Sequence, residues 1–294
     1  MYNYKMFNFI FYFLINVIIL STSKYIVIIR THYKLNNFKK SLFKEYSIIL
    51  QNEKLYDLYF LYEKKNNDRI MNEDILYMND LKNKHKKTNY FVYNEKDIKK
   101  KIPSFNPKIP NRKIKIFNPI NYYYHIPSVI LLLKKLKENN FYEGIWVFED
   151  DARFNGNIKE FLSFYEKKDF DYITSNVINI EEMDKNWWAL NLTTWNLKIS
   201  YRKWKSDHVQ MYSLRFLNFI EQLLYLNIIS MEESYEATIC GLLPWCKMHA
   251  MNEDNFVGYK YSWVEHIYKD EWKNNISNNP INKNKWFHGY DDNN

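Results

Sequence analysis

Three consecutive carboxylates, Glu149, Asp150 and Asp151, follow the mostly apolar run GIWVF in this 294-residue chain. Such a run predicts a buried strand, and ligands of open α/β sheets bind beyond the carboxyl ends of strands. Adjacent carboxylates repel one another there unless a cation is present, and Mg²⁺ or Mn²⁺ favours oxygen ligands. The triplet therefore predicts a divalent-metal site that would clamp a diphosphate and help it leave. A solvated acidic turn is the alternative.

The residues ahead of the triplet have the pattern of a parallel α/β sheet. Residues 25–29 (YIVII) are β-branched and apolar, as in a buried parallel strand, and Arg30 and Thr31 follow them. Residues 35–51 place apolar side chains at helical spacing, and residues 55–62 predict a second strand. This order predicts an α/β domain with a mostly parallel sheet flanked by helices, and the acidic triplet at the carboxyl ends of its strands.

The rest of the chain continues this alternation. We expect strands at 89–93 and 172–175, and helices at 68–87, 122–139, 158–165, 215–226 and 232–243. Residues 96–121 contain four prolines among many lysines, which predicts an irregular basic loop. Residues 274–294 are rich in Asn and predict a loose tail, apart from the WFH sequence that ends at His288.

The N-terminus predicts a signal peptide or a short signal-anchor over residues 1–23. Residues 6–20 are apolar except for Asn8 and Asn16, which matches the length of a signal h-region. No apolar run reaches the roughly 18 residues of a secure membrane span, and a buried first strand or helix is the alternative. We therefore expect residues 24–290 to form the folded domain, in the lumen of the secretory pathway or anchored to an ER- or Golgi-type membrane.

Four segments of the chain resemble the GT-A fold glycosyltransferases, the nucleotide-diphospho-sugar transferases. They are YIVIIRTHYK from Tyr25, IWVFEDDARFNG around the triplet, SMEESYEATICGLLPWC from Ser230, and WFHG from Trp286. In that family these are the strand that meets the nucleotide, the metal-binding motif, the stretch with the base of inverting members, and the histidine that reaches back to the metal. The resemblance implies a GT-A-like, Rossmann-type domain, although the triplet has Glu where the commonest form of the motif has Asp.

The resemblance also implies metal ligands. Asp151 would be the main ligand of Mn²⁺ or Mg²⁺, and His288 would be a second. Glu149 would meet the donor ribose or the metal, and Asp150 would take either role. An exposed position in the tail is the alternative for His288.

Further roles follow for the donor and the acceptor. Arg30 and Thr31 would lie near the donor nucleotide, and a polar strand end is the alternative for both. A sugar hydroxyl is a poor nucleophile, so an inverting transferase needs a carboxylate within hydrogen-bond reach of it. Glu232, Glu233 and Glu236 are the candidates, and the last two lie three residues apart on the expected helix. We favour Glu233, and a solvated helix face is the alternative.

The positive charge of the chain is concentrated in one segment. Residues 79–116 hold 12 Lys or Arg and 3 Asp or Glu, whereas the whole chain has a formal net charge of +8. Such a segment is usually a solvated loop, but it also attracts anionic lipid, nucleic acid or a phosphorylated substrate. With 6 Arg against 36 Lys, the chain is poor in the residue that suits base recognition. We therefore expect no sequence-specific nucleic-acid binding.

The two cysteines exclude a disulfide scaffold and a cysteine-based zinc site. Cys240 and Cys246 are six residues apart. They would form one disulfide if the chain is lumenal, and two buried thiols otherwise.

The sequence favours a metal-dependent glycosyltransferase of the inverting type, which moves a sugar from a nucleotide-diphosphate donor to a hydroxyl of a glycan, protein or lipid. One alternative is a GT-A-like domain without catalysis that binds glycans or polyanions through its basic segment and aromatic residues. Another is a metal-dependent nuclease that uses the same triplet. The nuclease needs a lysine in the same strand–turn unit, and none follows closely.

Overall fold

The computed structural model describes residues 24–32, 34–64, 68–105, 125–136, 142–180, 197–206, 208–230, 232–258 and 267–291. The predicted signal peptide or anchor, over residues 1–23, lies outside this part of the chain, as does the basic loop beyond residue 105. Within the described ranges, no helix is long and apolar enough to cross a membrane.

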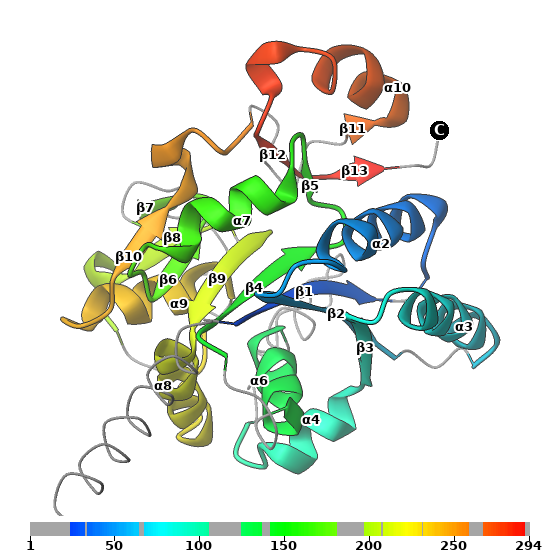
Figure 1. Ribbon diagram of the computed structural model, residues 1–294. Coiled ribbons are helices and arrows are strands. Elements are labelled where there is room, and N and C mark those ends of the chain that lie inside the picture. Colours follow the sequence, from blue (N-terminus) through cyan, green and yellow to red (C-terminus); the bar gives the residue numbers. More distant parts are fainter. Residues whose placement is uncertain are drawn as a thin grey trace, which may run out of the picture.

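Among the described residues, seven strands form a central sheet in the order β10-β6-β9-β4-β1-β2-β3 (Figure 1). Their bounds are β1 Tyr25–His32, β2 Tyr56–Glu63, β3 Thr88–Tyr93, β4 Gly144–Glu149, β6 Tyr172–Thr174, β9 Val209–Ser213 and β10 Met248–Ala250. All run in one direction except β9, which is antiparallel to both of its neighbours, β4 and β6. The predicted α/β class with a mostly parallel sheet is confirmed.

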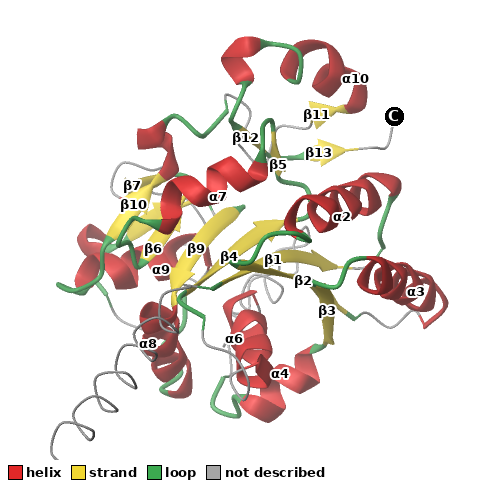
Figure 2. Ribbon diagram, in the orientation of Figure 1, coloured by secondary structure: helices red, strands yellow, loops and turns green. Residues whose placement is uncertain are grey.

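Helices cover both faces of this sheet (Figure 2). One face packs against α2 (Asn37–Leu50), α3 (Asp68–Lys84) and α7 (Ile158–Glu166), and the other against α4 (Glu95–Lys101), α6 (His125–Leu136), α8 (Leu214–Tyr225) and α9 (Glu232–Leu242). The side chains of strand β4 are apolar on both faces of the sheet, as alternation along a strand allows. Trp146 and Phe148 pack on the side of α2, α3 and α7, and Ile145 and Val147 pack on the side of α4, α6, α8 and α9.

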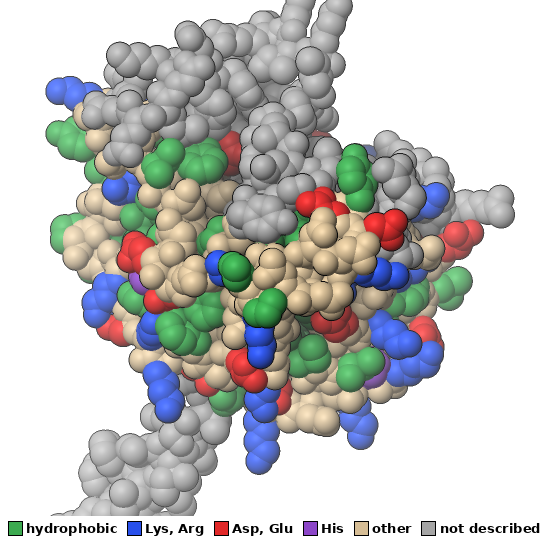
Figure 3. Space-filling view, turned by 90° about the horizontal axis from the view of Figure 1, so that it is seen from above, with side chains coloured by type: hydrophobic (Ala, Val, Ile, Leu, Met, Phe, Trp, Pro, Cys, Tyr) green, Lys and Arg blue, Asp and Glu red, His purple; other side chains and the backbone are tan. Residues whose placement is uncertain are grey.

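Shorter elements complete the described chain. They are β5 (Arg153–Phe154), β7 (Val177–Asn179), β8 (Lys203–Lys205), β11 (Ile267–Tyr268), β12 (Trp286–Phe287), β13 (Tyr290–Asp291), the helix α10 (Lys269–Glu271), and single turns at Ile199–Tyr201, Met251–Asp254, Trp272–Ile276 and Pro280–Asn282. Strand β5 pairs with β12, β7 with β8, and β11 with β13. Viewed from above, basic and acidic side chains are interspersed on the described part of the face (Figure 3).

Two expectations about loops are wrong. The predicted basic loop begins instead with α4. Asn94 and Asp97 form a capping box at the start of this helix, and its residue Ile98 is buried in the core. The predicted loose tail is folded from residue 267 to residue 291. Its Trp286 is fully buried and contacts the rings of Phe148 and other aromatic residues. The high Asn content of this segment favoured the prediction of a loop, although its few apolar side chains are buried.

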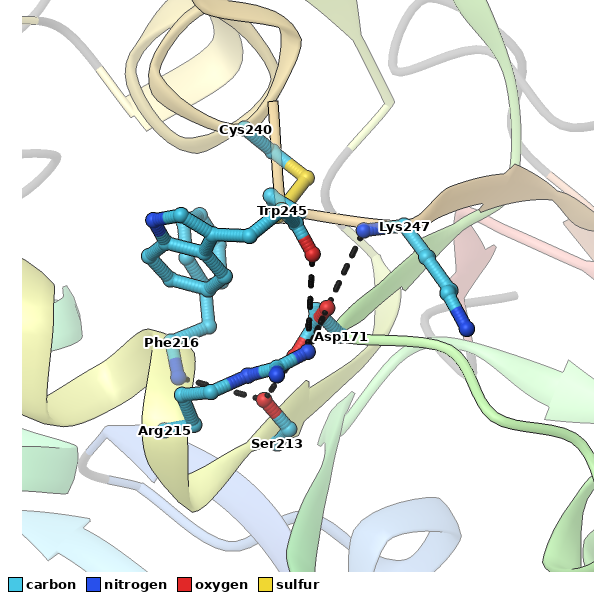
Figure 4. The surroundings of a disulfide bond; sticks show 8 residues. Asp171, Ser213, Arg215, Phe216, Cys240, Trp245 and Lys247 are labelled. Carbon is cyan, nitrogen blue, oxygen red and sulfur yellow. Dashed lines mark hydrogen bonds and ion pairs between the residues drawn. A yellow bond between two sulfur atoms is a disulfide. The ribbon is translucent and has the colours of Figure 1, made fainter. Parts of the chain in front are cut away.

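Cys240 and Cys246 form a disulfide at the end of α9, so the first of the two alternatives for the cysteines is the observed one. The Arg215 guanidinium lies over the ring of Trp245, 4.9 Å from its centroid, within the loop that the disulfide closes (Figure 4). Arg215 also donates to both carboxylate oxygens of the buried Asp171, at 3.0 and 2.6 Å. The disulfide therefore fixes a loop that packs against α8 and the start of β6.

Replacing both cysteines, in Cys240→Ser/Cys246→Ser, should lower the free energy of unfolding by about 2 kcal/mol, since closing a loop of this length restricts the unfolded chain. Urea unfolding of the two proteins, each with and without a reducing agent, measures the difference. The reducing agent should lower the midpoint of the wild type and leave that of the variant unchanged. Equal midpoints for oxidised wild type and variant would show that the disulfide contributes no stability.

Candidate metal centre

The pairing of β9 with β4 brings a histidine to the acidic triplet. Phe148 lies opposite Val209 in the antiparallel register, so His208 comes beside Glu149 at the end of β4. The Glu149 N–H donates to the His208 carbonyl at 2.9 Å. The side chains also meet, with His208 Nδ1 2.5 Å from Glu149 Oε2.

The C-terminal residues bring a second histidine to the same place. Phe287 of β12 lies opposite Arg153 of β5, two residues after Asp151. The next residue, His288, has its Nε2 3.2 Å from Asp151 Oδ2 and 3.5 Å from Glu149 Oε2. It is 6% exposed, so the alternative of an exposed tail position is wrong.

The two histidine rings are stacked, with centroids 3.2 Å apart and planes 13° apart. Glu149, His208 and His288 each offer a ligand atom, and these atoms all lie within 4.8 Å of one another. Asp151 adjoins this group through its contact with His288. The donor set is thus two imidazoles with one or two carboxylates, which suits a divalent transition metal.

Opposite charges in this group stabilise one another. Burial raises the pKa of Glu149, but His208, His288 and Arg30 outweigh it and hold that pKa well below its usual range. Burial likewise raises the pKa of Asp151, and His288 more than offsets it, so this pKa is also lowered. Burial lowers the pKa of His288, but Asp151 and Glu149 raise it to about 10. In the metal-free protein His288 therefore supplies positive charge to the carboxylates.

The remaining members of the predicted donor site form a second group of contacts. Arg30 lies opposite Glu149 in the parallel register of β1 and β4 and forms an ion pair with it. Thr31 donates its hydroxyl to the buried Asp150. Lys39, in the first turn of α2, has its Nζ 2.6 Å from Asp150 Oδ2. Asp150 is thus held by β1 and α2, whereas Glu149 and Asp151 contact the histidines.

The two candidate bases on α9 differ in their surroundings. Glu236 is fully buried, with its carboxylate 3.1 Å from Nζ of Lys205, which is also fully buried. Lys205 Nζ also donates to Gln210 Oε1 at 2.9 Å. Glu236 therefore belongs to a buried ion pair. An acceptor hydroxyl could reach its carboxylate only by displacing Lys205. Glu233 is half-buried and stays the predicted base.

Sequence analysis missed two residues of the centre, His208 and Lys39. His208 directly precedes β9, and Asp207 lies outside the described residues. The apolar and β-branched character of residues 209–212 (VQMY) was the signal for a strand. Its antiparallel direction, which decides where His208 lies, has no local signal in the sequence.

Searches against protein-family models and against curated proteins found no match to this chain.

Metal-free protein should lose stability as the pH rises from 7 to 10. The pKa of His288 is raised from its ordinary 6.5 to about 10, so its stabilising charge is fully present below pH 6.5 and is lost as the pH passes through 10. Melting temperatures measured in a metal chelator should therefore fall by several degrees more in wild type than in His288→Gln, whose side chain does not titrate. Parallel declines in the two proteins would contradict this assignment of charge.

Proposed function

We propose that this protein is a metal-dependent glycosyltransferase that transfers a sugar from a nucleotide-diphosphate donor to a hydroxyl acceptor. The observation that carries the proposal is the convergence of Glu149, His208 and His288 at the carboxyl ends of parallel strands, where α/β sheets bind their ligands. The resemblance of the four sequence segments to GT-A enzymes supplies the reaction.

The donor set favours Mn²⁺ over Mg²⁺. Mg²⁺ binds oxygen ligands and gives up its water reluctantly, whereas imidazole nitrogens suit transition metals better. Two of the three clustered side chains are histidines. A divalent ion held by them would neutralise charge on the leaving diphosphate.

The chain's own residues would orient this centre and complete the reaction. Arg30 holds one oxygen of Glu149 while His208 contacts the other, so the carboxylate is fixed from two sides. Arg30, which is not among the proposed ligands, would belong to the layer of contacts that commonly orients metal ligands. In an inverting reaction Glu233 would accept the proton of the acceptor hydroxyl.

A metal-dependent nuclease is the second candidate, and one contact favours it. The lysine missing from the strand–turn unit is supplied from elsewhere, because α2 brings Lys39 to Asp150. Mn²⁺-dependent cleavage of plasmid DNA that is lost in Lys39→Ala would support the nuclease. The transferase predicts no cleavage.

Donor binding should be visible as a thermal shift. Wild-type protein with Mn²⁺ should melt at a higher temperature in one nucleoside diphosphate or nucleotide sugar of a panel, because a ligand that binds only the folded state stabilises it by about 2.7 kcal/mol at one hundred times its dissociation constant. The shift should require Mn²⁺ and should be lost in Asp151→Ala and in His208→Ala.

His249→Ala is the matched control for these variants. His249 is also a partly buried histidine in contact with a carboxylate, that of Asp254 at 2.5 Å, but it lies on β10 and outside the metal group. It should keep the shift. A panel without any Mn²⁺-dependent shift, on protein that melts cooperatively, would contradict the proposed donor site.

A further inference from the structure

The turn that follows the acidic triplet contacts the C-terminal segment, which we define as residues 267–291. Strand β5, which begins two residues after Asp151, pairs with β12 of this segment. The Arg153 guanidinium lies over the ring of Trp272, 4.8 Å from its centroid, and 5.3 Å from that of Phe38. The segment that carries His288 is therefore attached next to the residues with which His288 forms its ion pairs.

Asn155 makes four hydrogen bonds to this segment. Its backbone N–H donates to the Lys285 carbonyl at 2.8 Å, and its own carbonyl accepts from the Asn284 N–H at 2.6 Å. Its side-chain amide donates to the carbonyls of Ile276 and Asn282, each at 3.1 Å. Asn155 thus joins the β12 side of the segment to its helical turns.

The next residue is packed closely against the same segment. A Cβ added to Gly156 would lie 2.4 Å from Asn284 Oδ1 and 3.1 Å from Asn284 Cα. The backbone of the turn therefore approaches the segment more closely than a side chain would allow. Ile276 and Asn282, whose carbonyls the Asn155 amide reaches, are themselves buried.

We propose that Asn155 is a positioning residue that fixes the C-terminal segment so that His288 stays at the metal centre. This role in metal binding rests on the proposed function. The side-chain amide of Asn155 donates its two N–H groups to two carbonyls of the helical turns. An aspartate has the same shape but no N–H to donate. The two carbonyls would then face a carboxylate, and the segment would separate from the turn.

The test compares Asn155→Asp with Asn278→Asp. Both changes remove an amide and add one negative charge, but the Asn278 amide donates to Lys273 within the segment and is exposed. Mn²⁺ affinity, titrated by electron paramagnetic resonance of the free ion, should fall about tenfold in Asn155→Asp, as is usual for residues that orient metal ligands. It should stay within twofold of wild type in Asn278→Asp. An added carboxylate alone would favour cation binding, so a loss of affinity has the opposite sign to the charge effect.

A double-mutant cycle with His288→Ala separates positioning from general destabilisation. If Asn155 acts through His288, Asn155→Asp should change Mn²⁺ affinity less than twofold in the His288→Ala background. A tenfold loss in both backgrounds, or no loss in either, overturns the proposal.

Hydrogen exchange tests the attachment of the C-terminal segment without any metal. Amides of residues 281–288 should exchange faster in Asn155→Asp than in wild type or Asn278→Asp. Wild type that binds no Mn²⁺ would contradict the proposed function, and unchanged exchange at 281–288 in Asn155→Asp would contradict the anchoring role itself.

Discussion

Carboxylates that are crowded at the end of a buried strand need positive charge beside them, and this requirement organises the candidate site. Asp150 is buried, and Glu149 and Asp151 are half-buried. Their opposite charges come from separate parts of the chain. Arg30 extends from the neighbouring strand, Lys39 from the helix after it, and the two histidines from β9 and from the C-terminal segment. Because no single segment supplies these partners, the site exists only when the fold is complete.

These partners divide the triplet into two environments. Asp150 is held by a lysine and a threonine hydroxyl. Glu149 and Asp151 share histidines, whose nitrogens can instead bind a metal. A cation entering the second environment would take over the charge that His288 provides in the metal-free protein. This difference explains why adjacent carboxylates can serve different purposes.

The fold could be predicted from the sequence where its pattern is local. Strand β1, helix α2 and strand β2 were expected from apolar runs and helical spacing, and the triplet was expected at the end of β4 because GIWVF is apolar on both faces. His208 could not be placed, since its contact with Glu149 depends on the antiparallel insertion of β9. The C-terminal tail was predicted to be loose because it is rich in asparagine. Its Trp286 and Phe287 are nevertheless buried, and their burial brings His288 into the site. The ion pair between Lys205 and Glu236 also depends on tertiary structure, because the two residues are far apart in the sequence. The sequence motif alone therefore could not show that Glu236 is part of a buried ion pair.

The most direct test of the metal centre is anomalous diffraction from crystals grown with Mn²⁺ and a nucleoside diphosphate. The account predicts one manganese peak in bonding contact with Glu149, His208 and His288, with the diphosphate oxygens beside it. Manganese bound elsewhere on the chain, with His288 still paired to Asp151 and Glu149, would contradict it.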